Sequence, residues 1–112
     1  MEITPKTLAQ GVLTNTPGTV LYTVPSGKTA IIKTATFVNT DGSAATLNYI
    51  KDDGSNAVHL APVAHSLATG LAYIDANLHV LEAGYTLKGD SGTDAAMEFT
   101  IEGYEQEAEE QS

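Results

Sequence analysis

The sequence contains no cysteine and no arginine, and lysine occurs only five times in 112 residues. Without cysteine there is no disulfide framework, no thiolate nucleophile and no cysteine-based zinc site. The same absence suits a protein that is assembled in a reducing cytoplasm. With so few cations the chain has no lysine- and arginine-rich patch that could displace counterions from nucleic acid, and anionic membranes are disfavoured for the same reason. We therefore expect neither a nucleic acid nor a membrane as a partner.

Long apolar runs are also missing. No segment approaches the ~20 apolar residues that a membrane-spanning helix needs. Residues 1–5 lack a basic segment followed by an apolar one, so we expect no signal peptide. A chain of 112 residues corresponds to one domain, large enough to bury about two thirds of its unfolded surface around a single core.

What the chain has in excess is acid, with 14 Asp and Glu residues and a net charge of −9. Such an excess mainly favours solubility. Four glutamates lie in the last eight residues, and removing their four charges takes the net charge from −9 to −5. We expect residues 105–112 to be a solvated, disordered tail.

Residues 19–39 are the centre of the predicted fold, and we expect two strands there joined by a tight turn. The turn is predicted at residues 25–27, where Pro fixes φ and Gly tolerates a positive φ. The second strand, residues 29–38, is rich in Ile, Val, Thr and Phe, which fit a pleated, half-buried surface. Strict alternation predicts Ile32 and Val38 on one face and Phe37 on the other.

Further strands are predicted at intervals of about ten residues. Ala45, Leu47 and Tyr49 alternate with Thr46, Asn48 and Ile50, and the Asp-Gly-containing segment 51–56 predicts a hairpin loop. Residues 57–69 fit either a strand or a one-turn helix, and their neighbours favour a strand. Residues 71–76 and 85–88 are predicted strands on either side of a turn at 82–84. Residues 89–94 have the composition of a loop.

The last predicted strand has the clearest alternation, with Met97, Phe99 and Ile101 facing inward and Gly103 ending it. Together these elements predict an all-β fold, a single antiparallel β-sandwich or jelly roll of seven to eight strands. Residues 1–17 are predicted to be an N-terminal arm or an edge strand, and residues 18–104 the sandwich. The two interpretations of the first segment differ in function, since an arm could lie on a neighbouring subunit.

Two short motifs resemble parts of catalytic or nucleotide-binding sites. Residues 89–92, Gly-Asp-Ser-Gly, have the composition found around the nucleophile of chymotrypsin-like proteases, but that chemistry also needs a His base, a buried Asp and a walled cleft. Residues 26–29 resemble the end of a P-loop, but Tyr22 stands where the motif requires Gly. A strand is predicted after Lys28, whereas phosphate binding needs a helix N-terminus. We predict a turn at this second motif and a loop at the first.

The remaining polar residues predict no site. The three histidines have neither the i, i+2 spacing of a strand face nor the i, i+4 spacing of a helix that would make a metal pair. Side-chain oxygens of two loops could hold calcium, although neither loop has the twelve-residue pattern that would make such a prediction specific. The residues concerned are Asp52, Asp53, Asn56, Asp90 and Asp94. The five tyrosines could stack on sugars, but core and subunit contacts are their expected role. We predict no catalytic, cofactor-binding or metal-binding residue, no cofactor, and a protein that is not an enzyme.

Two sequence motifs resemble those of small bacteriophage virion proteins. The first is Tyr-Thr-Val-Pro-x-Gly-Lys-Thr-Ala at residues 22–30, with Val-Asn-Thr at 38–40. The second is Val-Leu-Glu-Ala-Gly-Tyr-Thr-Leu at residues 80–87, where Tyr85 stands in place of the family's usual Asp. The resemblance covers roughly residues 19–104. It is to capsid decoration (cement) proteins and short β-structured fibre or tail domains.

The resemblance implies a structural role in the virion. We expect a protein made in the host cytoplasm that binds the major capsid protein on the outer surface of the shell as a homodimer or homotrimer. The alternative is a receptor- or glycan-binding tail or fibre domain. The candidate contacts with the capsid or with another subunit are the apolar residues of the first segment and two tyrosines, namely Leu8, Val12, Leu13, Tyr73 and Tyr85.

Overall fold

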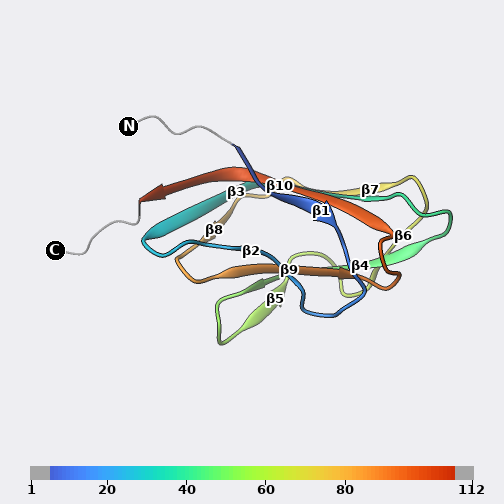
Figure 1. Ribbon diagram of the computed structural model, residues 1–112, viewed down its shortest axis with the longest axis horizontal. Helices are drawn as coiled ribbons and strands as arrows, with labels where there is room; N and C mark the ends of the chain where they lie inside the picture. The colour runs from blue at the N-terminus through green and yellow to red at the C-terminus, as the bar shows by residue number, and fades with distance from the viewer. Residues whose placement is uncertain (1–5, 108–112) are drawn as a thin grey trace.

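The computed structural model describes residues 6–107, which form two antiparallel β-sheets of five strands each in a sandwich-like arrangement (Figure 1). The all-β prediction is confirmed. The strand bounds are β1 Lys6–Val12, β2 Val20–Thr23, β3 Lys28–Asn39, β4 Ala45–Asp52, β5 Ala57–His59, β6 His65–Leu67, β7 Ala72–Asp75, β8 His79–Leu81, β9 Thr86–Ser91 and β10 Met97–Glu107.

The strands pair in a nested order. The first pairs with the last, β1 with β10, and the second with the one before the last, β2 with β9. Inside these, β3 pairs with β7 and β8, and β4 pairs with β5 and β6. Pairing of β10 with β3 and of β9 with β4 completes the two sheets, β1-β10-β3-β7/β8 and β2-β9-β4-β5/β6. Ten strands result, more than the seven to eight predicted, because the partners of β3 and β4 are each split into two short strands.

The two strands and the tight turn predicted at residues 19–39 are present, but the two strands do not pair with each other. The Lys28 N–H donates to the Pro25 carbonyl oxygen over 3.2 Å, and Gly27 has a φ of 79°. The two strands joined by this turn belong to different sheets: β2 pairs with β9, and β3 pairs with β10. The turn therefore carries the chain from one sheet to the other.

A bulge where β3 pairs with β10 changes which residues of β3 face the core. Glu102 is opposite Thr34 and Gly103 is opposite Ile32, so Lys33 is the extra residue. Beyond the bulge the inward positions shift by one. Ile32 is consequently buried in the core together with Phe37, and the strict alternation predicted for β3 is wrong.

The core lies between the sheets, where the rings of Phe37, Tyr49 and Phe99 meet. The ring centroids of Phe37 lie 4.9 Å from Tyr49 and 6.5 Å from Phe99. The inward residues predicted for the first half of β10, Met97, Phe99 and Ile101, are buried as expected. In β4 the structure buries one of the two alternating sets, Ala45, Leu47 and Tyr49.

Asn39 closes the end of β3 and gives the Val-Asn-Thr phrase a structural role. Its side chain is buried, and its amide nitrogen donates to the carbonyl oxygens of Leu67 at 2.8 Å and Ser43 at 3.0 Å. Its side-chain oxygen accepts the N–H of Asp41 at 2.8 Å. One polar side chain thus holds the turn after β3 and the end of β6 against each other.

Several strand boundaries in the structure differ from the predicted ones. Residues 57–69 contain two short strands, β5 and β6, in agreement with the favoured alternative, and the predicted loop at 89–94 begins inside β9. Gly103 does not end the last strand, which continues to Glu107, so residues 105–107 are paired with β3 rather than disordered. The rest of the predicted tail, residues 108–112, lies outside the described residues. Residues 6–12 form the edge strand β1 of their own sheet.

Candidate functional site

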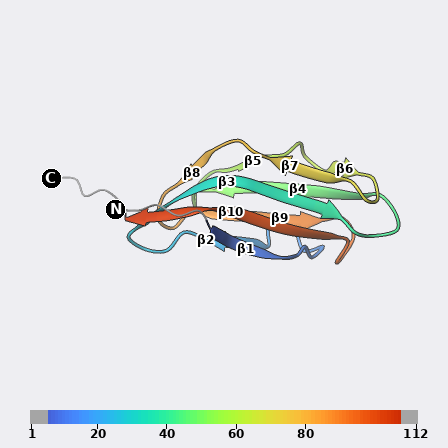
Figure 2. The same ribbon diagram turned by 90° about the horizontal axis from the view of Figure 1, so that it is seen from above.

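Exposed apolar side chains are concentrated on one long side of the sandwich. This side, which we call the β5–β8 edge, consists of residues 57–81 and joins the edges of both sheets (Figure 2). It carries six of the eight large apolar side chains that the described chain exposes, with exposed fractions between 46% and 69%: Val58, Val63, Leu71, Ile74, Leu78 and Val80.

Pairing with β3 explains why two of these side chains face solvent. Ile74 of β7 is opposite the half-buried Thr36, while its neighbour Asp75 is opposite Ala35 and points into the core. Val80 of β8 is opposite Ile31, which lies beside the core residue Ile32 and on the other face of β3. Ile74 and Val80 therefore lie on the outer face of their sheet.

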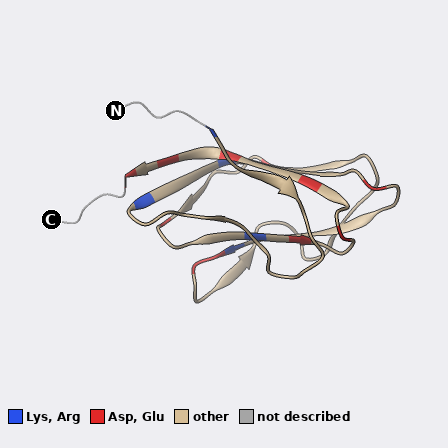
Figure 3. Cartoon of the chain, viewed as in Figure 1, with Lys and Arg blue, Asp and Glu red and all other residues tan. Residues whose placement is uncertain are grey.

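The β5–β8 edge carries almost no charge. Residues 54–81 contain no lysine, and their one acidic residue is Asp75, which is 3% exposed. Its carboxylate lies 2.8 Å from the imidazole Nε2 of His79. Burial raises the pKa of the Tyr49 hydroxyl in the core, and the nearby charge of Asp75 raises it further. Acidic residues are instead found on other elements, notably along β10 (Figure 3).

Side chains connect the two sheets at this edge. The Tyr73 hydroxyl on β7 donates to the Leu60 carbonyl oxygen over 3.4 Å, and the Tyr73 ring lies 5.2 Å from that of His65 on β6. Tyr73, one of the predicted contacts, is therefore a half-buried bridge within the edge. These contacts join the two sheets along the side that carries the exposed apolar side chains.

The opposite side of the sandwich is formed by β1 and β2 and carries the other two exposed apolar side chains. Val12 is 50% exposed and Val20 is 49% exposed. Of the remaining predicted contacts, Leu8 is partly buried against the core and Leu13 is 1% exposed, so Leu13 offers no surface to a partner. Tyr85 lies apart from them, half-buried, with the Lys51 ammonium 5.7 Å from its ring centroid.

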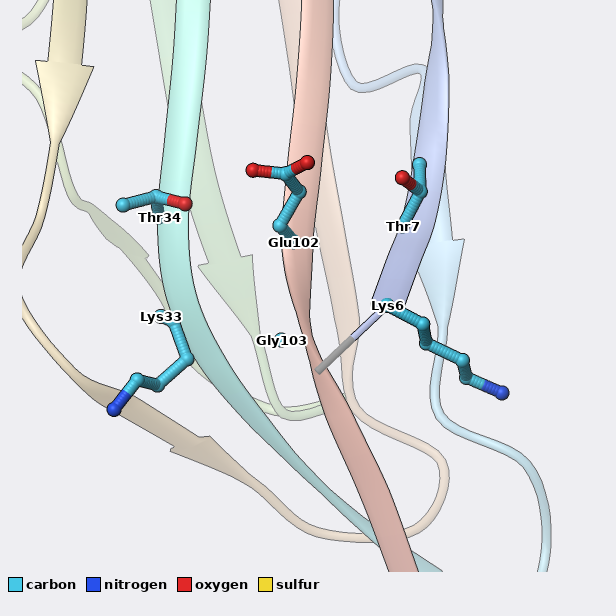
Figure 4. A pocket seen from close by; sticks show the side chains of 6 residues that line it. All are labelled: Lys6, Thr7, Lys33, Thr34, Glu102 and Gly103. Carbon is cyan, nitrogen blue, oxygen red and sulfur yellow. The ribbon is translucent and has the colours of Figure 1, made fainter. Parts of the chain in front are cut away.

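A shallow hollow of about 380 Å³ lies over the bulge on the outer face of the sheet that contains β1, β10 and β3 (Figure 4). Lys6 and Lys33 stand on either side of Gly103 and point away from each other. The Lys6 ammonium lies 3.3 Å from the Glu105 carboxylate, and Glu102 lines the hollow between the two lysines. The mixed charges and the divergent lysines form no convergent set of ligands.

The motifs that resembled catalytic and nucleotide sites have structural roles. Ser91 is fully buried in β9, and its hydroxyl oxygen accepts the Thr93 N–H over 3.3 Å. The Lys28 ammonium lies 2.6 Å from the Glu107 carboxylate at the end of the β3–β10 pair. Within residues 6–107 no three His, Cys, Asp or Glu side chains are grouped so that they could hold a metal ion.

Three of the four aspartates considered for calcium, Asp52, Asp53 and Asp90, form hydrogen bonds or ion pairs within the chain. The Asp53 carboxylate accepts the N–H groups of Ser55 and Asn56, and Asp52 accepts the Gly54 N–H and lies 2.7 Å from the Lys88 ammonium. The Lys88 ammonium and the Gly54 N–H lower the pKa of Asp52 below the ordinary range of an aspartate, and the N–H groups of Asn56 and Ser55 do the same for the pKa of Asp53. Asp90 accepts a hydrogen bond from the Asn48 amide.

Comparison of the chain with family models, with curated proteins and with solved structures found no match. Within the described part of the chain no helix has the length and hydropathy to cross a membrane. Sequence reasoning missed the β5–β8 edge, although the sequence carries a signal for it. The signal is a run of 28 residues, 54–81, that contains a single acidic residue and no lysine in an otherwise acidic protein.

Proposed function

We propose that this protein is a non-enzymatic virion protein that binds the outer surface of a bacteriophage capsid and stabilises it. The proposal combines the two phrases at residues 22–30 and 80–87 with the distribution of apolar surface. Its partners are the major capsid protein and further copies of itself, and its location is the capsid surface.

The nested pairing supports a jelly roll as the form of this sandwich. A jelly roll results when a long antiparallel hairpin of four strand pairs is wrapped around a core. The four pairs here are β1 with β10, β2 with β9, β3 with β7 and β8, and β4 with β5 and β6. Counting each split partner once leaves eight strand positions. Jelly rolls are frequent in viral capsid proteins and also in lectins, so this fold agrees with the proposal without singling it out.

The observation that carries the proposal is that six of the eight exposed large apolar side chains lie on the β5–β8 edge, while the other two, Val12 and Val20, lie on the opposite long side. Isolated proteins rarely leave such surfaces uncovered, and apolar surface of this kind marks protein contacts. A rigid body with contacts on two sides can bridge neighbouring subunits. In the proposed role these contacts must break before the shell can open, and several modest contacts add up to firm attachment.

We assign attachment to the shell to β1. In residues 6–107 this strand pairs only with β10 and lies at the edge of its sheet, the position at which a partner strand can be added. It also carries the exposed Val12 and the partly buried Leu8. A capsid segment that covers Val12 would bury an apolar side chain, which is worth about 1.5–3 kcal/mol when burial is complete.

The test is co-sedimentation of the purified protein with empty capsid shells, together with the melting temperature of the shells. The parent protein should bind the shells and raise their melting temperature. Val12→Lys should weaken binding at least about tenfold, since a charge buried at the contact costs more than 1.4 kcal/mol. Ser26→Lys, in the exposed turn between β2 and β3, is the control and should bind as the parent does.

Failure to bind shells or to raise their melting temperature would refute the capsid role. Binding of the same protein to whole bacterial cells or to isolated glycans would instead support the fibre alternative.

A further inference from the structure

We propose that the β5–β8 edge is the surface through which two copies of this chain associate. The inference deepens the proposed function and rests on it for its biological purpose, since it names the surface behind the expected homo-oligomer. Its physical basis is independent, and consists of the apolar surface, the missing charge and the open strands of this edge.

The apolar surface has the size that a dimer needs. Six aliphatic side chains, each about half exposed, together offer on the order of 600 Å² along this edge, whereas the largest single apolar patch on a monomeric protein is about 300–600 Å². A standard interface buries about 800 Å² on each partner, and about 65% of a homodimer interface is apolar. The exposed apolar area of the β5–β8 edge is thus about as large as the apolar area that one partner buries in such an interface.

The distribution of charge favours a second copy of the chain as the occupant. Every copy has a net charge of −9, so most of its surface opposes the approach of another copy. Residues 54–81 are the exception, because their single acidic side chain is buried and lies beside His79. An uncharged apolar surface is complementary to itself, as a two-fold contact between identical surfaces requires.

The backbone of the edge is also available. Within the described residues β7 and β8 pair only with β3, while β5 and β6 pair only with β4. Their outer N–H and C=O groups are therefore free to pair with a strand of another molecule. Lysine and proline often protect such edges, and β5, β6, β7 and β8 contain neither, so their protection is limited to their length of three or four residues.

Sedimentation equilibrium of the full chain, without shells, tests the inference. The parent should associate at concentrations up to about 100 μM. The double variant Ile74→Lys/Val80→Lys should weaken association at least about a hundredfold, since it places like charges opposite each other in an apolar contact. Both side chains are exposed, so the double variant should keep the circular dichroism spectrum of the parent.

Val20→Lys is the matched control, because Val20 is about as exposed as Val80 but lies on the opposite side of the sandwich. It should associate within about twofold of the parent. Raising the salt concentration should tighten association of the parent, because salt screens the repulsion between acidic surfaces while the apolar contact persists.

A parent protein that stays monomeric at about 100 μM would overturn the inference. So would a double variant that associates as the parent does, or loss of association in Val20→Lys. A parent that associates through this edge but does not bind shells would refute the capsid role alone.

Discussion

Gly103 is the residue whose replacement tests the bulge most directly. A Cβ atom added at this position would lie 2.0 Å from the Ile31 carbonyl oxygen, 3.0 Å from the Ile31 carbonyl carbon and 3.1 Å from the Ile32 Cα. All three neighbours are backbone atoms of β3. This strand cannot move aside easily, because β10 is paired on one side of it and β7 and β8 on the other.

The expected cost of Gly103→Ala is about 3 kcal/mol. Forcing an extra carbon into a well-packed site usually costs about 1–3 kcal/mol, and an overlap with fixed backbone belongs at the upper end of that range. The alternative response is for residues 103–107 to separate from β3. Separation would break the hydrogen bond from the Tyr22 hydroxyl to Glu105 and the Lys28–Glu107 ion pair, so it too is costly.

Denaturant unfolding and the melting temperature measure this cost, and a loss of 3 kcal/mol corresponds to a fall of roughly 10–20 °C for a domain of this size. Gly11→Ala is the control, because Gly11 lies on the neighbouring strand β1 and its added Cβ meets only the Phe99 ring at 3.4 Å. The control should be neutral or slightly stabilising. A Gly103→Ala protein within about 0.5 kcal/mol of the parent would refute the close approach.

Two further substitutions test the polar contacts. Asn39→Ala should lower the free energy of unfolding by about 1–3 kcal/mol in denaturant titrations, since the buried Leu67 carbonyl and the Ser43 carbonyl lose their donor, and an unchanged midpoint would contradict this role. The hydrogen bond from Tyr22, together with the Lys6 ammonium, holds the pKa of Glu105 below its ordinary range. Stability from this carboxylate is therefore present above its unfolded pKa of about 4.3 and is lost as pH falls through its lower folded pKa. Glu105→Gln should show a smaller drop in denaturant midpoint than the parent between about pH 5 and pH 3, and equal drops would refute the assignment.

The sequence predicted well those strands whose side chains alternate without interruption. In β4 and in the first half of β10 every second residue is apolar and buried, for example Leu47, Tyr49, Phe99 and Ile101. Alternation of this kind is a direct consequence of the two-residue period of a strand with one face on the core. It allowed the all-β class to be predicted.

The parts that failed depend on contacts between distant residues. Gly103 interrupts the alternation of β10 and looks like a strand end, whereas it is a site of close backbone approach to β3. The turn at Pro25 has the same local chemistry whether it closes a hairpin or crosses between sheets, so the sequence could not assign β2 to its sheet. The β5–β8 edge is composed of short strands, and their exposed apolar residues, such as Ile74, resemble core residues until their strands are placed.

The nested pairing has a consequence for how the chain folds. Lys6 is opposite Gly103, so among the described strands β1 is made first and pairs only with β10, which is made last. The same applies to β2, which must wait for β9. Chains whose contacts join residues far apart in sequence fold slowly, typically in milliseconds to seconds, because the loop between the partners must close first. Of the described strands, β3 and β4 are the ones that find partners before β9 and β10 are made, which makes the strands β3–β8 the expected nucleus and leaves β1 and β2 to close the sandwich afterwards.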